Sequence, residues 1–341
     1  MIVDAGGVRV TGAEAPDPAP GEVLVRTVVA GVCGSDTHAL LGRHPFITLP
    51  YPPGHEVAGV VVSSGPPAGG DTVPSLPAGT RVAVEPYLPC WGCKQCLAGR
   101  PNVCERLRFF GCAHDQGGMA DYFTIDRRRL HVVPDGLGWR AAALIEPLST
   151  PVHAIRLAGG VRDRAVAILG AGTIGLLTLR VARAHGARRI VMTARSQANR
   201  ERAASFGADT AVPPSAAAVR DALGESADVV IDCVAEQSTI ADAIALAGNG
   251  GTVVVVGVPP ADVVIPLPVV QDSQIRIQGS ATYLPEDVAD AMRLLAGGTV
   301  AAADFVTAVH PLDAAAEAFA DAERAGHIKV LLAPNPADVD G

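Results

Sequence analysis

Over the first 150 residues, hydrophobic positions occur in short stretches that alternate with polar residues. The stretch at 66–79 is rich in Pro, Gly and Ser, and it predicts a surface loop. Valine-rich segments bounded by Gly and Pro are typical of β-strands, so this part of the chain is predicted to be β-rich. The predicted strands are 8–10, 22–29, 56–63 and 81–84.

From residue 165 onward, predicted strands alternate with predicted helices. Residues 165–169 form an unbroken apolar run, as expected of a strand buried on both faces. Residues 173–185 place Ile174, Leu177 and Val181 on one face of a helix. Such alternation predicts a doubly wound parallel sheet. The further strands are expected at 190–192, 229–231, 253–256 and 275–277.

The last fifty residues are predicted to leave this sheet. They contain helical patterns at 285–295 and 312–324, followed by an apolar strand at 328–332 that we expect to return to the first domain. With 341 residues, of which 49% are hydrophobic and 18% charged, the chain is long and apolar enough for two domains. We therefore predict an α/β protein with a β-rich domain over 1–150 and 298–341 and a doubly wound domain over 151–297.

The charge balance excludes several classes of partner. The chain has 27 Lys and Arg against 35 Asp and Glu, which gives a net charge of −8. An acidic chain has no general attraction for nucleic acid or for an anionic membrane, so we expect neither as a partner.

The sequence also lacks an uninterrupted apolar run of about 20 residues and a signal peptide, and this predicts a cytoplasmic protein.

A glycine-rich motif directly follows the predicted strand at 165–169. It reads Gly170-Ala171-Gly172-Thr173-Ile174-Gly175 and matches GxGxxG. The first glycines permit a tight turn and a close approach of the backbone, and the N-terminus of the next helix offers free N–H groups to a pyrophosphate. Because the motif lies between a buried strand and an amphipathic helix, it predicts a dinucleotide site.

The end of the next predicted strand indicates which dinucleotide binds. NAD-dependent proteins place an acidic residue there to bind the ribose hydroxyl. No residue from 186 to 200 is acidic, and Ala194 and Arg195 follow the strand, with Arg200 nearby. A guanidinium suits a 2′-phosphate, so we predict that NADP is preferred over NAD. The alternatives are that Arg195 is a solvated surface residue, or that Glu201 reaches the ribose.

Four of the seven cysteines follow the spacing C-x2-C-x2-C-x7-C. In a chain without a secretion signal, this clustering favours metal binding over disulfides. Four thiolates on one loop suffice for a closed, tetrahedral structural zinc site. An iron–sulfur cluster and a metal-free reduced loop are the alternatives. The predicted ligands are Cys90, Cys93, Cys96 and Cys104.

A second set of possible metal ligands is dispersed over the first 150 residues. Cys33 and His55 offer two ligands for a catalytic zinc, which needs three protein ligands and one open position. Glu56 or Glu146 is the third, and the sequence leaves that choice open. Asp36 is expected to orient His55. Taken alone, the cysteine and the histidine are also compatible with ordinary core positions.

Together these motifs resemble the zinc-dependent medium-chain dehydrogenases of the alcohol dehydrogenase superfamily. The likeness covers almost the whole chain, and the motifs occur in the family's order. The segment Glu146-Pro147-Leu148 resembles the sorbitol and threonine dehydrogenase branch, whereas other alcohol dehydrogenases have a cysteine at that position. The resemblance implies a GroES-like catalytic domain, a Rossmann domain and a homo-oligomer, either a dimer or a tetramer.

The resemblance also implies roles for individual residues. Cys33 and His55 would bind the catalytic zinc. Glu56 and Glu146 would share the remaining coordination, one of them through a water molecule. Thr150 would contact the nicotinamide side of the cofactor, and the four clustered cysteines would hold a second zinc. The proton relay of the family is matched by Ser35 and His38.

The reaction expected from these roles is the exchange of a hydride between an alcohol and a nicotinamide. Zinc lowers the pKa of the substrate hydroxyl, the proton leaves through Ser35 and then His38, and the hydride passes to the cofactor; the reverse reaction reduces a ketone. A polyol, cyclitol or sugar is the expected substrate. However, the polyol branch usually has an Arg-Tyr pair after the last sheet strand, where this chain has Thr282-Tyr283.

Three other interpretations remain open. One is a threonine-type amino-alcohol dehydrogenase. A second is a noncatalytic nucleotide-binding relative, which would be expected to have lost zinc ligands or relay residues, whereas this chain has kept them. A third is a zinc-ribbon nucleic-acid module, which the few basic residues of the cysteine lobe disfavour.

Overall fold

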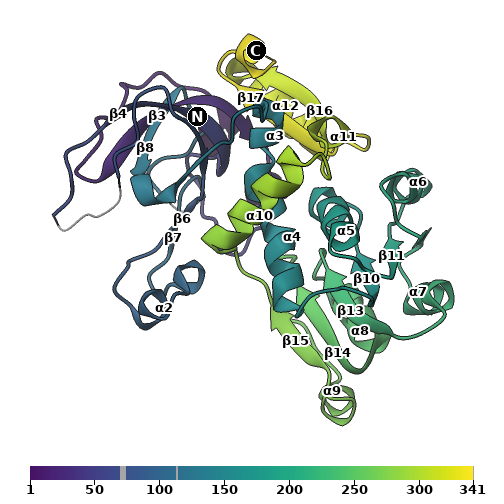
Figure 1. The fold of residues 1–341 in the computed structure, drawn as a ribbon. Helices are drawn as coiled ribbons and strands as arrows, with labels where there is room; N and C mark the ends of the chain where they lie inside the picture. The colour runs from purple at the N-terminus through teal and green to yellow at the C-terminus, as the bar shows by residue number, and fades with distance from the viewer. Residues whose placement is uncertain (70–73, 113, 341) are drawn as a thin grey trace. The chain divides into compact units, whose positions relative to one another are not determined.

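The computed structural model of the protein describes residues 1–69, 74–112 and 114–340 (Figure 1). The chain divides into two compact units, one made of Met1–Glu146 and Ala291–Gly341 and the other of Pro147–Asp290. The chain crosses from one unit to the other at two points, which lie within the helices α4 (Ile145–Leu157) and α10 (Pro285–Ala296). In the described residues, no helix combines the length and the hydropathy needed to cross a membrane.

The first unit is built on a seven-stranded sheet. Its strands are ordered β16-β17-β3-β4-β5-β9, and β8 also pairs with β3. In β3, inward-facing valines such as Val23 and Val25 alternate with Glu22 and Arg26, and this alternation buries one face of the strand. The strands are β3 (Glu22–Gly31), β4 (Glu56–Ser64), β5 (Arg81–Val84), β8 (Tyr122–Asp126), β9 (Leu130–Val132), β16 (Val306–Pro311) and β17 (Lys329–Ala333).

The core of the first unit includes buried side chains such as Val57, Phe110, Phe123 and Leu332. Two antiparallel strand pairs complete the strands: β1 (Ile2–Asp4) with β2 (Gly7–Arg9), and β6 (Tyr87–Leu88) with β7 (Arg108–Phe109). The helices of this unit, apart from the part of α10 that lies in it, are α1 (Gly34–Leu40), α2 (Lys94–Leu97), α3 (Trp139–Ala142), α11 (Ala302–Phe305) and α12 (Ala315–Glu323).

The last strand of the chain joins this sheet, as predicted. β17 pairs antiparallel with β3, placing Leu331 opposite Gly31 and Leu332 opposite Ala30. The predicted loop over 66–79 includes residues 70–73, which lie outside the described residues; 66–69 and 74–79 contain no helix or strand. The strands β8, β9 and β16 were not predicted, because each is short and carries polar residues that weaken the hydrophobic pattern.

The second unit contains a six-stranded parallel sheet. The order β12-β11-β10-β13-β14-β15 is the dinucleotide-binding arrangement 3-2-1-4-5-6. Buried residues such as Leu169, Val191, Val230 and Val253 form its core, which explains why these strands appear in the sequence as continuous apolar runs. The strands are β10 (Ala165–Leu169), β11 (Arg189–Thr193), β12 (Thr210–Val212), β13 (Ala227–Asp232), β14 (Ala247–Val255) and β15 (Arg276–Gly279).

Helices connect these strands in sequence (Figure 1). α5 begins at Thr173, directly after the glycine motif, and ends at Ala184. It packs against β10 and β11 with its buried face, which contains Leu176, Leu177 and Val181. The remaining helices are α6 (Gln197–Ser205), α7 (Ala216–Leu223), α8 (Gln237–Leu246) and α9 (Leu267–Asp272). This order confirms the predicted doubly wound architecture.

Candidate active site and metal centres

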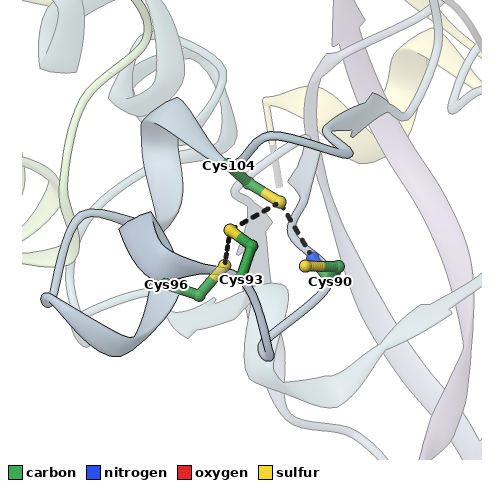
Figure 2. Close-up of side chains that lie close together, drawn as sticks. All are labelled: Cys90, Cys93, Cys96 and Cys104. Carbon is green, nitrogen blue, oxygen red and sulfur yellow. Dashed lines mark hydrogen bonds between the residues drawn. The ribbon is translucent and has the colours of Figure 1, made fainter.

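The four clustered cysteines converge on one point in the loop around α2 (Figure 2). The sulfur of Cys93 lies 3.5 Å from that of Cys96 and 3.8 Å from that of Cys104. Four sulfurs at about 2.3 Å from a tetrahedral ion would be about 3.8 Å apart, so these separations suit zinc. They are far longer than the roughly 2.05 Å of a disulfide, and all four cysteines are free.

Backbone amides reinforce this set of sulfur ligands. The N–H groups of Cys90 and Arg106 both donate to the sulfur of Cys104, at 3.2 and 3.3 Å. A hydrogen bond from the backbone of Gly92 lowers the pKa of Cys90 to about 6, whereas burial raises the pKa of Cys96 to about 12. Because amide donors favour the thiolate form, the loop is suited to hold a cation.

A second group of metal-binding side chains lies where β3 and β4 approach each other. Cys33 precedes α1, His55 precedes β4, and Glu56 is the first residue of β4. One ligand atom from each of these three residues lies within 4.8 Å of the others. Sulfur, imidazole nitrogen and carboxylate oxygen are all zinc ligands, and three protein ligands are the number that a catalytic zinc site needs.

The carboxylate of Glu56 is held by a lysine that no sequence motif indicates. The Nζ atom of Lys329 donates to both oxygens of Glu56, at 2.7 and 2.6 Å, and to the carbonyl of Val32 at 3.0 Å. Burial is the strongest single effect and acts to lower the pKa of Lys329, but the charges of Glu56 and Cys33 and the hydrogen bonds to Glu56 together outweigh it, and the pKa is raised. Gly31 leaves room for this pair, since a Cβ there would lie 2.0 Å from an oxygen of Glu56.

The predicted partner of His55 is present but not close. Oδ1 of Asp36 lies 4.0 Å from Nδ1 of His55. The two oxygens of Asp36 accept from the Tyr51 hydroxyl and from the Cys33 backbone N–H, both at 3.1 Å. Burial, together with the Asp36 charge, raises the pKa of Tyr51, so its hydroxyl stays protonated and donates.

A sixth cysteine, Cys112, which was not predicted to belong to the site, is nearer to His55. The sulfur of Cys112 lies 3.3 Å from Nδ1 of His55, and both residues are buried. The ring of Phe109 packs edge-on against the imidazole, with 5.8 Å between ring centroids. Asp36, His55 and Cys112 form a further group of potential metal ligands, which shares His55 with the group of Cys33 and Glu56; its ligand atoms lie within 4.8 Å of one another.

The structure places the remaining predicted residues as follows. Ser35 and His38 lie one turn apart on α1, where Ser35 is half-buried and His38 is exposed. Glu146 is buried in the first turn of α4, and its charge acts on Lys329. Among the described residues, the potential metal-binding groups around His55 include Glu56 and do not include Glu146. Thr150 is half-buried in the same helix.

In the second unit, each glycine of the GxGxxG motif has a distinct steric role. Gly170 has φ +98° and faces Val234, whose methyl would lie 2.6 Å from an added Cβ. A Cβ on Gly175 would lie 2.0 Å from the Gly170 carbonyl oxygen, so this glycine permits the close packing of α5. A Cβ on Gly172 would meet nothing within 4 Å, which leaves open space at the N-terminus of α5.

The motif lies at the switch point of the parallel sheet. The loops after β10 and β13, which are neighbouring strands, leave the same edge in opposite directions. Buried Asp232 ends β13 and accepts from the N–H groups of Val234 and Ala235, both at 2.9 Å, and from the Thr239 hydroxyl at 2.7 Å. These bonds hold Val234 against the glycine loop.

The residues after β11 differ in how free their side chains are. Ala194 is buried and Arg195 is exposed. Arg200 turns back and donates to the carbonyls of Ala194 and Arg195, at 3.0 and 2.8 Å, so it braces the loop. The Glu201 carboxylate accepts a hydrogen bond of 2.8 Å from the Gln197 side chain. Arg195 is therefore the cation that is exposed at the strand end.

Two family models match the chain. The model described as an alcohol dehydrogenase GroES-like domain matches residues 19–135, and the model described as a zinc-binding dehydrogenase matches residues 173–297. Both matches agree with the architecture of the unit in which they lie.

Similar proteins of known name and structure extend these matches over the chain. L-Galactonate-5-dehydrogenase of Escherichia coli is 34% identical over 311 residues, covering 90% of this chain and 89% of that protein. Sorbitol dehydrogenase of Ovis aries is 32% identical over 347 residues, covering 99% and 96%. A zinc-binding dehydrogenase from Sinorhizobium meliloti, solved bound to NADP, superposes with a TM-score of 0.88 at 33% identity, covering 97% of each chain.

Proposed function

The chain belongs to the zinc-dependent medium-chain dehydrogenases of the alcohol dehydrogenase superfamily, and we propose that it oxidises a polyol, cyclitol or sugar at a secondary hydroxyl, using NADP in preference to NAD. The enzyme acts on a CH–OH group, and the reverse reaction reduces the corresponding ketone. The observation that carries the proposal is the convergence of Cys33, His55 and Glu56 in the GroES-like unit.

The proposal assigns two zinc ions to each chain. Cys33 and His55 would hold the catalytic ion, Glu56 or Glu146 would complete its coordination, and the four clustered cysteines would hold the structural ion. When bound, the catalytic ion supplies Lewis-acid polarisation of the substrate oxygen. Lys329 holds Glu56 in place; His55 and Glu56 are buried, and Cys33 is half-buried.

Ser35 and His38 provide the route by which the substrate proton leaves. Ser35 is half-buried, directly after the first turn residue Gly34, and His38 is exposed on the same helix three positions later. Residues three apart on a helix are neighbours, so a proton accepted by the inner hydroxyl can be relayed to the outer imidazole and then to water. An imidazole is suited to this step because one ring nitrogen can accept a proton while the other releases one.

The polyol, cyclitol or sugar class is supported by the names of the relatives and by Glu146. L-Galactonate-5-dehydrogenase and sorbitol dehydrogenase are both named for polyhydroxylated substrates. The alternative, a threonine-type amino-alcohol dehydrogenase, shares the same ligands and differs in the substrate pocket. Because Thr282 stands where the polyol branch has arginine, we expect the substrate contacts of this enzyme to differ from those of sorbitol dehydrogenase.

The cofactor site is proposed to lie at the switch point of the parallel sheet. The pyrophosphate would occupy the open space at Gly172, next to Thr173 and Ile174 in the first turn of α5, and Thr150 would contact the nicotinamide side. The 2′-phosphate would bind Arg195, with Arg200 bracing the loop. Support comes from the absence of a carboxylate at Ala194 and from the hydrogen bond that occupies Glu201.

We also propose that the enzyme is a cytoplasmic homo-oligomer, either a dimer or a tetramer. β15 is an edge strand of the six-stranded sheet, and Ile277 on it is exposed. Large apolar side chains on and beside α9, including Val264 and Leu267, are exposed as well. An unpaired edge beside exposed apolar residues favours pairing with another copy. The seven free cysteines suit a reducing compartment.

A screen of secondary alcohols tests the proposed substrate class. Purified enzyme is assayed with polyols, cyclitols, sugars, simple secondary alcohols and L-threonine, each with NADP and with NAD, and formation of the reduced nicotinamide is followed by absorbance. We expect the highest kcat/KM with a polyhydroxylated substrate. A clear preference for L-threonine would support the amino-alcohol alternative, and no turnover with any polyhydroxylated compound would contradict the proposal.

A further inference from the structure

Cys112 contacts a predicted zinc ligand although it lies outside both predicted ligand sets. Its sulfur is 3.3 Å from Nδ1 of His55, which is within hydrogen-bonding range for sulfur. Both side chains are buried, so the ring nitrogen has no access to bulk water in place of this contact. A buried polar nitrogen needs a partner, because leaving it unsatisfied costs about 1–3 kcal/mol.

The local backbone brings the cysteine to this position. Gly111 has φ +74°, and a Cβ there would lie 2.2 Å from the carbonyl oxygen of Gly54. The segment that carries Cys112 therefore packs directly on the backbone that carries His55. The Gly118 N–H also donates to the Gly54 carbonyl at 2.8 Å, which fixes the two segments together. The approach of sulfur to imidazole is thus built into the backbone.

The other acceptor near Nδ1 is more distant and already engaged. Oδ1 of Asp36 lies 4.0 Å from this nitrogen, beyond the length of a hydrogen bond. The same oxygen accepts from the Tyr51 hydroxyl at 3.1 Å, and Oδ2 accepts from the Cys33 N–H. The carboxylate therefore contributes charge near the imidazole, and the sulfur is the atom in hydrogen-bonding contact with it.

We propose that Cys112 is a positioning residue for the catalytic metal ligand His55, accepting a hydrogen bond from Nδ1–H. With the proton on Nδ1, the lone pair of the imidazole resides on Nε2, which is then available to bind zinc. Partners that fix the tautomer and the orientation of a ligating histidine strengthen metal binding. The inference rests on the proposed function, because it assumes that His55 binds the catalytic zinc.

Zinc affinity of the whole enzyme tests this role independently of turnover. Zinc is titrated against a colorimetric chelator of known affinity for the wild type, Cys112→Ala and Cys112→Ser. Removing the acceptor should raise the zinc Kd of the weaker site by about tenfold, the lower end of the range for lost partners of metal ligands, because sulfur is a weak acceptor. Serine keeps an acceptor and should stay closer to the wild type. The four-cysteine site should be unchanged in both variants.

Two further variants separate positioning from simple packing. Cys112→Val fills the space without an acceptor. It should therefore weaken zinc binding as much as Cys112→Ala does, including when Cys112→Ala lowers the Tm. Cys233→Ala is the matched control: Cys233 lies in the second unit, where its sulfur is 3.8 Å from the Thr178 hydroxyl. This control should leave both zinc affinities at the wild-type values.

The outcomes distinguish this inference from the proposed function. Wild-type zinc affinity in both Cys112→Ala and Cys112→Val would overturn the positioning role, while a wild type with two zinc ions would leave the proposed function standing. A wild type that binds only one zinc would instead contradict the proposed function. In the cobalt-substituted enzyme, loss of about half of the thiolate-to-cobalt absorption of the weaker site in Cys112→Ala would identify Cys112 as a direct ligand and overturn the inference.

Discussion

The ammonium of Lys329 donates hydrogen bonds to both carboxylate oxygens of Glu56, at 2.7 and 2.6 Å, and the two side chains are almost fully buried. They come from distant parts of the chain: Lys329 begins the last strand and Glu56 begins β4. The pair therefore ties the C-terminal segment to the backbone that carries His55. It also orients one of the two carboxylates proposed for the catalytic zinc.

Substitution of Lys329 by methionine should strongly destabilise the first unit. It leaves Glu56 buried without a counter-charge, and breaking a buried pair in this way costs about 3–5 kcal/mol. Urea unfolding at neutral pH measures the change. Arg188→Met is the control, because its pair with Glu225 is solvent-exposed and should be worth no more than about 1 kcal/mol. Equal free energies of unfolding for the two variants would show that the buried pair contributes no more to stability than the exposed pair.

Chelation should remove the two proposed zinc ions at different rates. The catalytic site has an open position and should lose its metal and its activity first, whereas four thiolates enclose the structural ion. Metal analysis of freshly purified enzyme should give two zinc ions per chain, and a time course with a chelator should give two phases. Activity that persists until the second zinc has left would contradict the assignment of the catalytic ion.

Substitutions in the proposed active site should fall into two classes. Cys33→Ala and His55→Ala should abolish turnover, because they remove metal ligands. Ser35→Ala and His38→Ala should lower kcat by about 10²- to 10⁴-fold, as is typical for a lost proton transfer. Steady-state kinetics, with the Tm as a check on folding, distinguish the classes. Wild-type kcat in Cys33→Ala would show that the catalytic zinc lies elsewhere.

The cofactor preference should depend on Arg195. A charge-assisted contact with the 2′-phosphate contributes about 1.5–3 kcal/mol, which corresponds to a preference for NADP of about 10- to 100-fold. Arg195→Ala should remove most of this preference with little effect on NAD turnover, and Ala194→Asp should reverse it by charge repulsion. Values of kcat/KM for both cofactors decide the question. A wild type that prefers NAD would refute the assignment.

The glycines of the dinucleotide loop should respond oppositely to the same substitution. Gly172→Ala adds a methyl group in open space, so the protein should keep its Tm but lose cofactor affinity by tenfold or more, an estimate of about 1.4 kcal/mol for a blocked pyrophosphate contact. Gly175→Ala places the methyl 2.0 Å from the Gly170 carbonyl and should destabilise the second unit by about 1–3 kcal/mol. Thermal unfolding and cofactor titration of both variants provide the comparison. An unchanged cofactor Kd in Gly172→Ala would move the pyrophosphate away from this turn.

Local patterns were sufficient to predict the cysteine lobe and most of the second unit, although the short edge strand β12 (Thr210–Val212) was not predicted. The strand β10 and the start of α5 were predicted at the residues where they occur, because a buried parallel strand and an amphipathic helix have periodicities that a short window reveals. The cysteine lobe is likewise encoded within one loop, where spacing alone brings the sulfurs together. In the first unit, short strands with polar residues, such as β8 and β16, gave too weak a pattern to be predicted.

The surroundings of the proposed catalytic site were decided only by the tertiary structure. Lys329 follows Glu56 by 273 positions and Cys112 follows His55 by 57, so no local pattern links them. A lysine opening an apolar strand and a cysteine outside the lobe were the available signals, but neither specifies a partner. The sequence by itself determined the residue types able to bind metal and cofactor. Sheet pairing and close glycine contacts determined which of them meet, because contacts between distant segments depend on the packing of the whole unit.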